Sequence, residues 1–197
     1  MQPLIDQNGP YQTIFFVVVA ITAIPAALAT LWLRVRPGAS KRDSGSFFGI
    51  QTAAGLGILV AYWLARHFSA GTITPFRTEV FALGIALIPL GMLLNAYAVR
   101  HLGRYFTVQI AVRPDQPVVE TGPYRFVRHP AYTGQLITIL GVGVALTNWA
   151  SVATILALTL VGYGYRIGVE ERVLREALGA PYAEYMSRTR RLIPFIF

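Results

Sequence analysis

Residues 131–165 read AYTGQLITILGVGVAL-TNW-ASVATILALTLVGYGY, two apolar runs separated by three residues. Neither run, Ala131–Leu146 or Ala150–Tyr165, contains an acidic or basic side chain. A helix of this length is about 24 Å long, which is shorter than a hydrocarbon core of about 30 Å. The stretch therefore predicts a tight helical hairpin whose tip stops near the far membrane interface, with Trp149 as an interfacial aromatic residue.

Three longer apolar runs precede this hairpin, at Ile14–Leu33, Phe47–Leu64 and Val80–Val99. Each is close to the length that spans a bilayer. Hydrophobic residues make up 54% of the chain and charged residues only 13%, a composition typical of multi-pass membrane proteins. We therefore expect an all-α integral membrane protein with five transmembrane helices, the last two forming the short hairpin, followed by a cytoplasmic C-terminal helix.

Two regions follow from this division. Residues 1–99 are expected to form an N-terminal three-span membrane region. Residues 100–197 are expected to combine a polar loop, the hairpin and the C-terminal helix, and to carry the active site.

The distribution of positive charge predicts the orientation. With the N-terminus outside, fifteen of the seventeen Lys and Arg residues face the cytoplasm, and only Arg66 and Arg77 face outside. Because basic residues favour the cytoplasmic side, the C-terminus and any polar active site are expected there. The formal charge of +8 does not indicate nucleic-acid binding, because it flanks membrane spans instead of covering a soluble domain.

Several kinds of chemistry lack their sequence signals. The chain has no cysteine, which excludes disulfides and thiolate metal sites. Its three histidines, His67, His101 and His129, fall on both sides of the membrane in this topology, so no metal is expected. The serine-hydrolase pattern GxSxG and the dinucleotide pattern GxGxxG are also missing.

The polar stretch TGPYRFVRHPAYTGQ, residues 121–135, leads directly into the fourth apolar run. Proline suits the first turn of a helix and excludes the preceding residue from it, so His129-Pro130 predicts a forced turn into the helix. One interpretation is an interfacial anchor, in which arginines and tyrosines contact lipid headgroups. The other is a binding site.

The segment after the fifth run also allows two interpretations. Arg166 and Glu170 are four residues apart, so they share a face if the helix continues. A solvated amphipathic helix ending at Gly179 explains much of the pattern. Charged residues just below the hydrocarbon layer, however, usually mark function because unpaired charge is costly there.

Taken together, HLGRYF (101–106), QPVVETGPYRFVRHPAY (116–132), the hairpin, RIGVEERVLREALGAPYAEY (166–185) and RTRRLIP (188–194) resemble the isoprenylcysteine carboxyl methyltransferase family, which is related to membrane phospholipid methyltransferases. The resemblance covers about half the chain, from His101 to Pro194. It departs at Gln116, where the protein-processing members have histidine. Those members are also longer and have more spans.

The resemblance implies a site for S-adenosyl-L-methionine. The implied cofactor-binding residues are Gln109, Gln116, Pro117, Val118, Val119, Tyr124, His129, Pro130, Ala131, Tyr132 and Glu170. It further implies that Arg166 holds the carboxylate of the methyl acceptor, with Arg190 and Arg191 as further substrate contacts. Arg166 and Glu170 are thus the candidate catalytic residues. Aromatic faces suit a cationic sulfonium, and a glutamate suits an ammonium or hydroxyl group.

The expected function is methyl transfer to a lipidic or membrane-partitioned acceptor, such as a prenylcysteine-like α-carboxyl, with membrane lipid as the surrounding partner. A phospholipid or thiol methyltransferase of the same superfamily is an alternative. A membrane sterol-type reductase that binds NADPH is another, because such enzymes carry a similar Arg-His-x-x-Tyr stretch. A membrane scaffold or transporter without enzyme activity is the third.

Overall fold

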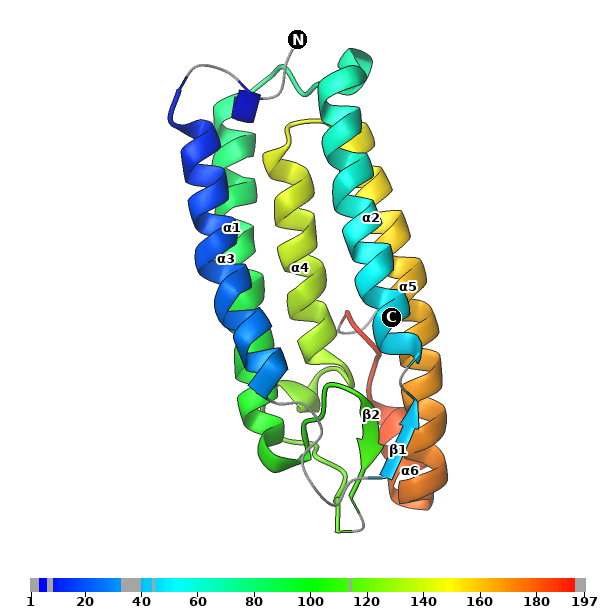
Figure 1. Ribbon diagram of the computed structural model, residues 1–197. Coiled ribbons are helices and arrows are strands. Elements are labelled where there is room, and N and C mark those ends of the chain that lie inside the picture. Colours follow the sequence, from blue (N-terminus) through cyan, green and yellow to red (C-terminus); the bar gives the residue numbers. More distant parts are fainter. Residues whose placement is uncertain (1–3, 7–8, 33–39, 44, 114, 194–197) are drawn as a thin grey trace.

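A computed structural model describes residues 4–6, 9–32, 40–43, 45–113 and 115–193 of the chain (Figure 1). The fold is mostly helical. The main helices are α1 (Tyr11–Trp32), α2 (Gly45–His67), α3 (Arg77–Leu102), α4 (Pro130–Ala145), α5 (Trp149–Leu178) and α6 (Ala180–Arg188). Short 3₁₀ helices lie at Leu4–Asp6 (η1), Ser69–Gly71 (η2), Gly103–Tyr105 (η3) and Gly122–Arg125 (η4), and two strands at Ser40–Asp43 (β1) and Ile110–Val112 (β2).

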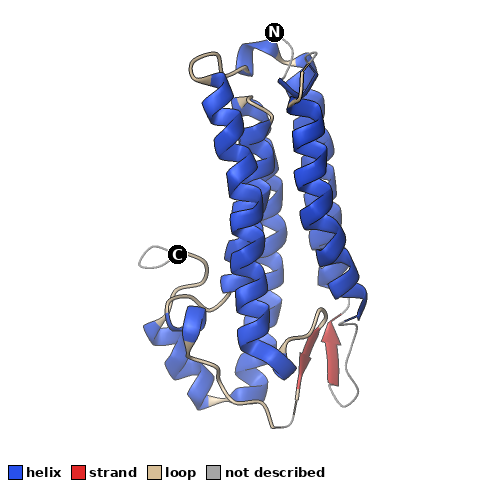
Figure 2. Cartoon of the chain, turned by 90° about the vertical axis from the view of Figure 1, so that its left-hand side faces the viewer, coloured by secondary structure: helices blue, strands red, loops and turns tan. Residues whose placement is uncertain are grey.

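Helices α1 to α5 form an elongated bundle, and α6 and the two strands gather at one end of it (Figures 1 and 2). Each of the five apolar runs lies within or overlaps one of these helices. Within the described residues, two helices are long and apolar enough to cross a membrane, at Arg77–Tyr105 and Trp149–Leu178. Shorter apolar helical stretches lie at Tyr11–Thr22 and Pro130–Ala145.

The expectation of a purely α-helical chain was incomplete. Strand β1 pairs antiparallel with β2, with Ser40 opposite Val112 and Lys41 opposite Ala111, and the register shifts before Asp43 meets Ile110. A strand of three residues is too short to show a period-two pattern. Its partner is also about 70 residues away along the chain, so only the tertiary fold brings the two together.

The helical hairpin forms as predicted, with α4 and α5 joined by a three-residue turn. Thr147 takes a positive φ of 51° in this turn. The Asn148 side chain caps α5 by accepting a hydrogen bond from the Ser151 amide at 3.1 Å, and it donates to the Phe68 carbonyl at 2.9 Å. The loop between α2 and α3 therefore holds the tip, whereas the side chain of Trp149 is exposed.

Helices α3 and α4 pack with almost no space between their backbones. A methyl group added at Gly91 would lie 2.4 Å from the Gly134 carbonyl oxygen, and one added at Gly84 would lie 2.3 Å from the Ala145 amide nitrogen. Both distances are too short for any side chain, so glycine permits the approach. Close packing of this kind drives helix association where the surroundings are as apolar as the helices. This close packing fixes the position of α4, which begins at Pro130 directly after His129.

The polar segment after the fifth apolar run is helical, as expected, but it is not a separate helix. Helix α5 continues to Leu178, and Gly179, at φ 64°, turns the chain into α6. Arg166 and Glu170 therefore lie on one helix and share a face, as predicted.

Candidate functional site at the polar end of the helical hairpin

Arg166 lies where α5 leaves the apolar part of the bundle, and its side chain is buried. Nε donates to the Tyr132 hydroxyl at 3.0 Å, Nη1 to the Ser46 hydroxyl at 2.8 Å and Nη2 to the Val108 carbonyl at 2.7 Å. One guanidinium thus joins α5 to α4, to the start of α2 and to the loop before β2. A planar group bonded on three sides has a fixed orientation.

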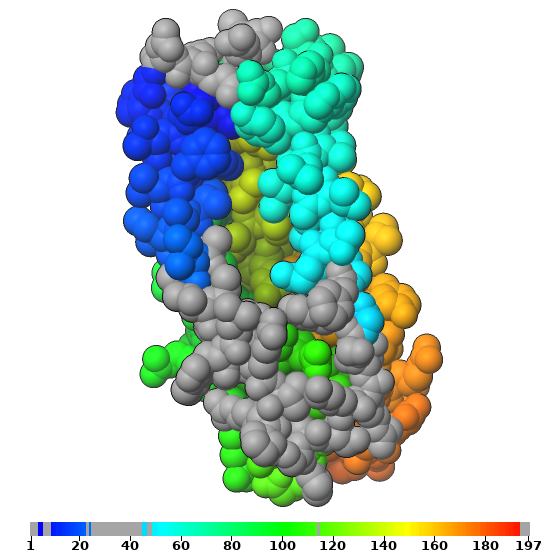
Figure 3. Space-filling view, viewed as in Figure 1, coloured from blue at the N-terminus to red at the C-terminus, as the bar shows by residue number. Residues whose placement is uncertain are grey.

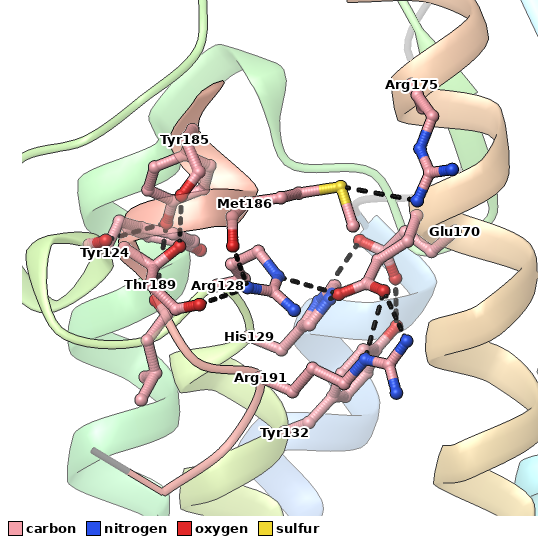
Figure 4. Close-up of polar contacts among 12 residues, drawn as sticks. Tyr124, Arg128, His129, Tyr132, Glu170, Arg175, Tyr185, Met186, Thr189 and Arg191 are labelled. Atoms are coloured by element: carbon pink, nitrogen blue, oxygen red, sulfur yellow. Dashed lines mark hydrogen bonds and ion pairs between the residues drawn. The ribbon is translucent and has the colours of Figure 1, made fainter. Parts of the chain in front are cut away.

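Tyr132 links Arg166 to the second predicted residue, Glu170. Its hydroxyl accepts from Arg166. The same hydroxyl donates to Glu170 Oε2 at 2.7 Å (Figure 4). The imidazole of His129 stacks on the Tyr132 ring at 5.6 Å between centroids, and its Nδ1 lies 4.0 Å from Glu170 Oε1. Four of the sequence-predicted residues are therefore connected by direct contacts.

Glu171 is a central residue that the sequence prediction missed. Its carboxylate is buried and accepts from Arg128 Nε at 2.8 Å, from Arg191 Nη2 at 2.9 Å and from His129 Nε2 at 3.3 Å. A buried carboxylate needs such partners, because an unpaired buried charge is strongly unfavourable. The adjacent glutamates 170 and 171 could have indicated it. Sequence alone, however, does not show which of the two faces the arginines.

Arg128 holds the C-terminal segment, from α6 to Arg191, against the start of α4. Besides Glu171, its Nη1 donates to the carbonyls of Met186 and Thr189. The amide of Arg128 bonds to the Arg190 carbonyl at 2.7 Å, and the amide of His129 bonds to the Arg191 carbonyl at 3.0 Å. Pro130 explains this pairing, since it keeps the preceding residues out of the helix and leaves their amides to an extended neighbour.

The contacting side chains of Arg128, His129, Glu171 and Arg191 form a polar cluster. Tyr124 is buried in η4, beside this cluster. Its carbonyl accepts from the Tyr185 hydroxyl at 2.7 Å, and its ring stacks with that of His101 at 6.3 Å. Burial, and then the negative charge of Glu170, raise the pKa of the Tyr124 hydroxyl. Burial likewise raises the pKa of Tyr185. Both phenols therefore stay neutral at physiological pH and serve as hydrogen-bond donors.

Gln109 follows Val108, the residue whose carbonyl holds Arg166. Its Oε1 atom is buried and has no hydrogen-bond partner among the described residues. A buried carbonyl oxygen without a donor is unusual in a folded protein. It marks a position where a ligand's donor group would be stabilised.

The remaining predicted residues differ in their placement. Pro130 is buried at the start of α4, and Ala131 accepts from Asn95 through its carbonyl. Gln116 accepts from the Arg113 amide at 3.3 Å. Pro117, Val118 and Val119 lie in the loop before η4. Among the described residues, no hydrogen bond or ion pair joins these four loop residues to Arg166 or Glu170.

The two C-terminal arginines have different surroundings. Arg190 is exposed and enters the cluster through its backbone carbonyl. Arg191 pairs with Glu171. Neither side chain is shown beside Arg166, so their suggested acceptor contacts stay predictions.

Comparison with known proteins gives a consistent result. The model of the isoprenylcysteine carboxyl methyltransferase (ICMT) family matches residues 83–176. The chain is 34% identical over 115 residues to protein-S-isoprenylcysteine O-methyltransferase B of Arabidopsis thaliana, covering 57% of this chain and 58% of the relative. It is 28% identical over 144 residues to a probable protein-S-isoprenylcysteine O-methyltransferase of Oryza sativa subsp. indica, covering 71% and 75%.

A third relative is the cobalt-zinc-cadmium resistance protein CzcN of Cupriavidus metallidurans, 36% identical over 123 residues, with 62% of this chain and 51% of the relative covered. Among solved structures, the eukaryotic intramembrane Ras methyltransferase ICMT matches with a TM-score of 0.58 at 21% identity, covering 98% of this chain and 70% of that one. At this identity the likeness is one of fold.

The family match spans α4 and the part of α5 that carries Arg166, Glu170 and Glu171, and the fold likeness extends over nearly the whole chain. The chain is an integral membrane protein that resembles the isoprenylcysteine carboxyl methyltransferase family, whose model matches its residues 83–176.

Proposed function

We propose that this chain transfers a methyl group from S-adenosyl-L-methionine to the carboxylate of a lipidic acceptor, such as a prenylcysteine-like α-carboxyl, and so forms a methyl ester. The match to the family model and the names of the similar proteins support the reaction class. The observation that carries the proposal is the Arg166–Tyr132–Glu170 chain, which sets a cation beside an anion at the end of an apolar hairpin.

Arg166 is the proposed acceptor-binding residue. Arginine recognises carboxylates because its planar N–H groups match the two oxygens. Its orientation is fixed by Tyr132, Ser46 and Val108 before any acceptor arrives. The acceptor carboxylate would bind at the edge of this guanidinium, with its lipid part along the apolar helices.

The donor would bind on the side of Glu170 and Tyr132. S-adenosylmethionine supplies an electrophilic methyl group on a cationic sulfonium. Glu170 suits its ammonium or ribose hydroxyls, the rings of Tyr132 and His129 suit a cation or the adenine, and the unpaired Gln109 Oε1 suits an N–H donor. The proposed donor site also includes Tyr124, Pro130, Ala131 and the loop 116–119.

A carboxylate acceptor is already ionised at neutral pH, so no side chain has to remove a proton. The residues then act by positioning, which contributes about 7–11 kcal/mol in well-oriented reactions. An amine or thiol acceptor would first lose a proton. Glu170, whose Oε1 lies 4.0 Å from His129 Nδ1, would then be the group that accepts it. This keeps a phospholipid or thiol methyltransferase as the second candidate.

The proposed topology has five spans, with the N-terminus outside and the C-terminus and active site in the cytoplasm. Residues 1–99 form the three-span region and 100–197 the methyltransferase region. The charge bias supports this orientation. The chain has no cysteine, so single cysteines test it directly. Arg125→Cys should react with an impermeant maleimide only from the cytoplasmic side, and Thr74→Cys only from outside.

Calorimetry on the detergent-purified chain tests the reaction class. S-adenosylhomocysteine should bind saturably, and Glu170→Ala should abolish this binding. Glu184→Ala, an exposed substitution on α6, is the matched control and should leave it unchanged. Incubation with N-acetyl-S-farnesylcysteine and the methyl donor should then give a base-labile methyl ester.

Three outcomes contradict the proposal in different ways. Binding of NADPH in place of S-adenosylhomocysteine would identify a reductase. Binding of neither would favour a scaffold or transporter. Donor binding with methylation of amines or thiols, but not of carboxylates, would identify the second candidate.

A further inference from the structure

Helix α5 carries a second feature on the face away from Arg166. Gly164 and Gly168 lie two residues to either side of Arg166, and helix positions two apart do not share a face. Both glycines are exposed, and a side chain added at either would meet open space. Figure 1 shows α5 as an outer helix of the bundle, and Figure 3 shows its surface at the edge of the molecule.

Two adjoining grooves run along this face. The first has a volume of about 320 Å³ and is lined by Leu160, Gly164, Ile167, Arg191 and Leu192. The second has a volume of about 380 Å³ and is lined by Gly168, Glu171, Arg172, Arg175, Glu176 and Arg191. Arg191 borders both, so they form one continuous surface, which we call the α5 groove. Its first part is apolar and its second part is charged.

The charged part is lined by three arginines and two glutamates, and two of the arginines, Arg172 and Arg175, form no ion pair among the described residues. Among the described residues, the side chain of Arg172 has no hydrogen-bond or ion-pair partner. The side chain of Arg175 contacts the sulfur of Met186, at 3.8 Å (Figure 4). Glu171, in contrast, is already bonded to Arg128 and Arg191. The two guanidiniums on α5 are therefore available to an anion.

The order of these features along α5 matches an amphiphile. Leu160 and Gly164 belong to the apolar run, whereas Arg172 and Arg175 follow its last residue, Tyr165, by about two to three turns. An acyl chain along the glycines would place its headgroup at the arginines. Arginine binds phosphate by bidentate, charge-assisted hydrogen bonds, and basic sites at the membrane boundary favour anionic lipids.

We propose that the α5 groove binds one anionic glycerophospholipid of the surrounding membrane, with its acyl chain beside Gly164 and its phosphate at Arg172 and Arg175. This site lies on a different face of α5 from Arg166 and Glu170 and does not depend on the proposed reaction. A second copy of the chain is a poorer occupant, because a symmetric contact across the glycines would bring the arginines of both copies together, and like charges repel.

Native mass spectrometry of the delipidated full chain in detergent tests the proposal. The probes are palmitoyl-oleoyl-phosphatidylglycerol and phosphatidylcholine, which share acyl chains and differ in net charge. The unmodified chain should bind one phosphatidylglycerol roughly 10-fold more tightly than phosphatidylcholine, as expected for two interfacial arginines. The double variant Arg172→Gln/Arg175→Gln should lose this preference.

Two further variants separate charge from shape. Arg100→Gln/Arg125→Gln removes the same charge from exposed positions outside the groove and should keep the preference. Gly164→Leu fills the apolar part and should weaken both lipids equally. Equal binding of the two lipids by the unmodified chain would overturn the proposal, as would equal effects of the two double variants. A dimer mass that Gly164→Leu abolishes would replace the lipid with a second copy.

Discussion

The Nε of Arg166 and the hydroxyl of Tyr132 are 3.0 Å apart and join the two helices of the hairpin at its polar end. The same hydroxyl donates to Glu170 at 2.7 Å. A cation on the proposed acceptor side and an anion on the proposed donor side are thus held by one phenol. Changes at any of the three residues should therefore have separable effects.

Arg166→Lys should keep the positive charge but lose the three hydrogen bonds that fix the orientation of the guanidinium. A lysine ammonium cannot reach Tyr132, Ser46 and Val108 together as the planar guanidinium does. We expect kcat/KM for the carboxylate acceptor to fall by about 100-fold, the usual cost of a misplaced group. Affinity for S-adenosylhomocysteine should change little. Steady-state kinetics and calorimetry measure the two quantities, and Arg172→Lys, an exposed change on the same helix, is the control.

Tyr132→Phe should affect both sides of the proposed site. It removes the hydroxyl that orients Arg166 and Glu170, and the expected loss of stability is about 1 kcal/mol. We expect donor affinity and acceptor KM both to worsen. Tyr163→Phe is the matched control, since it removes a 2.7 Å hydrogen bond from the Tyr163 hydroxyl to Gln135, which lies one helical turn after Tyr132 on α4. Identical kinetic losses in the two variants would contradict a special role for Tyr132.

Glu171→Ala should weaken the packing of α6 and the residues that follow it against the hairpin. It leaves Arg128 buried without its carboxylate, and breaking a buried pair costs about 3–5 kcal/mol. Thermal unfolding in detergent should show a large drop in midpoint, and limited proteolysis should cut near α6. Glu184→Ala removes an exposed carboxylate from α6 and should do neither. An unchanged unfolding midpoint in Glu171→Ala would show that the contacts of Glu171 do not hold α6 in place.

Gly91→Ala should separate α3 from α4. The added methyl group would lie 2.4 Å from the Gly134 carbonyl oxygen, so one helix must move. Overpacking of this kind costs about 1–3 kcal/mol, and the displaced α4 should also lower activity. Gly55→Ala adds the same methyl group where nothing lies within 4 Å. It should leave the unfolding midpoint and activity unchanged.

Alkaline pH should unfold the α6 end of the chain. Burial, and then Glu170 and Glu171, raise the pKa of Tyr182 above its ordinary value of 10.0. The unfolded chain therefore loses this proton before the folded chain does. The stability is fully present below pH 10.0 and falls above it, by about 1.4 kcal/mol per pH unit for one such group. Tyr182→Phe should extend stability to higher pH, whereas Tyr165→Phe, which changes an exposed residue, should not. The unfolding midpoint across pH 9–12 measures this.

Much of the fold could be predicted because helices are local. The apolar runs indicated the five long helices, and Pro130 correctly indicated the start of α4. The β1–β2 pair could not be predicted, since a three-residue strand has no detectable pattern and its partner is distant. The extension of α5 to Leu178 was uncertain because a change from apolar to charged residues does not by itself end a helix.

In the candidate site, too, local features could be predicted from the sequence, whereas contacts between distant segments could not. Spacing of four residues placed Arg166 and Glu170 on one face, and the sequence around His129 and Tyr132 indicated a site. The sequence by itself determined these helices, the residue types at the polar end of the hairpin, and the resemblance to the family. Only the tertiary structure decided which charges pair: that Glu171 accepts from Arg128 and Arg191, that Tyr132 bridges Arg166 and Glu170, and that Arg172 and Arg175 face outward. The reason is physical, since helix periodicity follows from backbone geometry, whereas the partner of a long charged side chain depends on which distant segments fold against it.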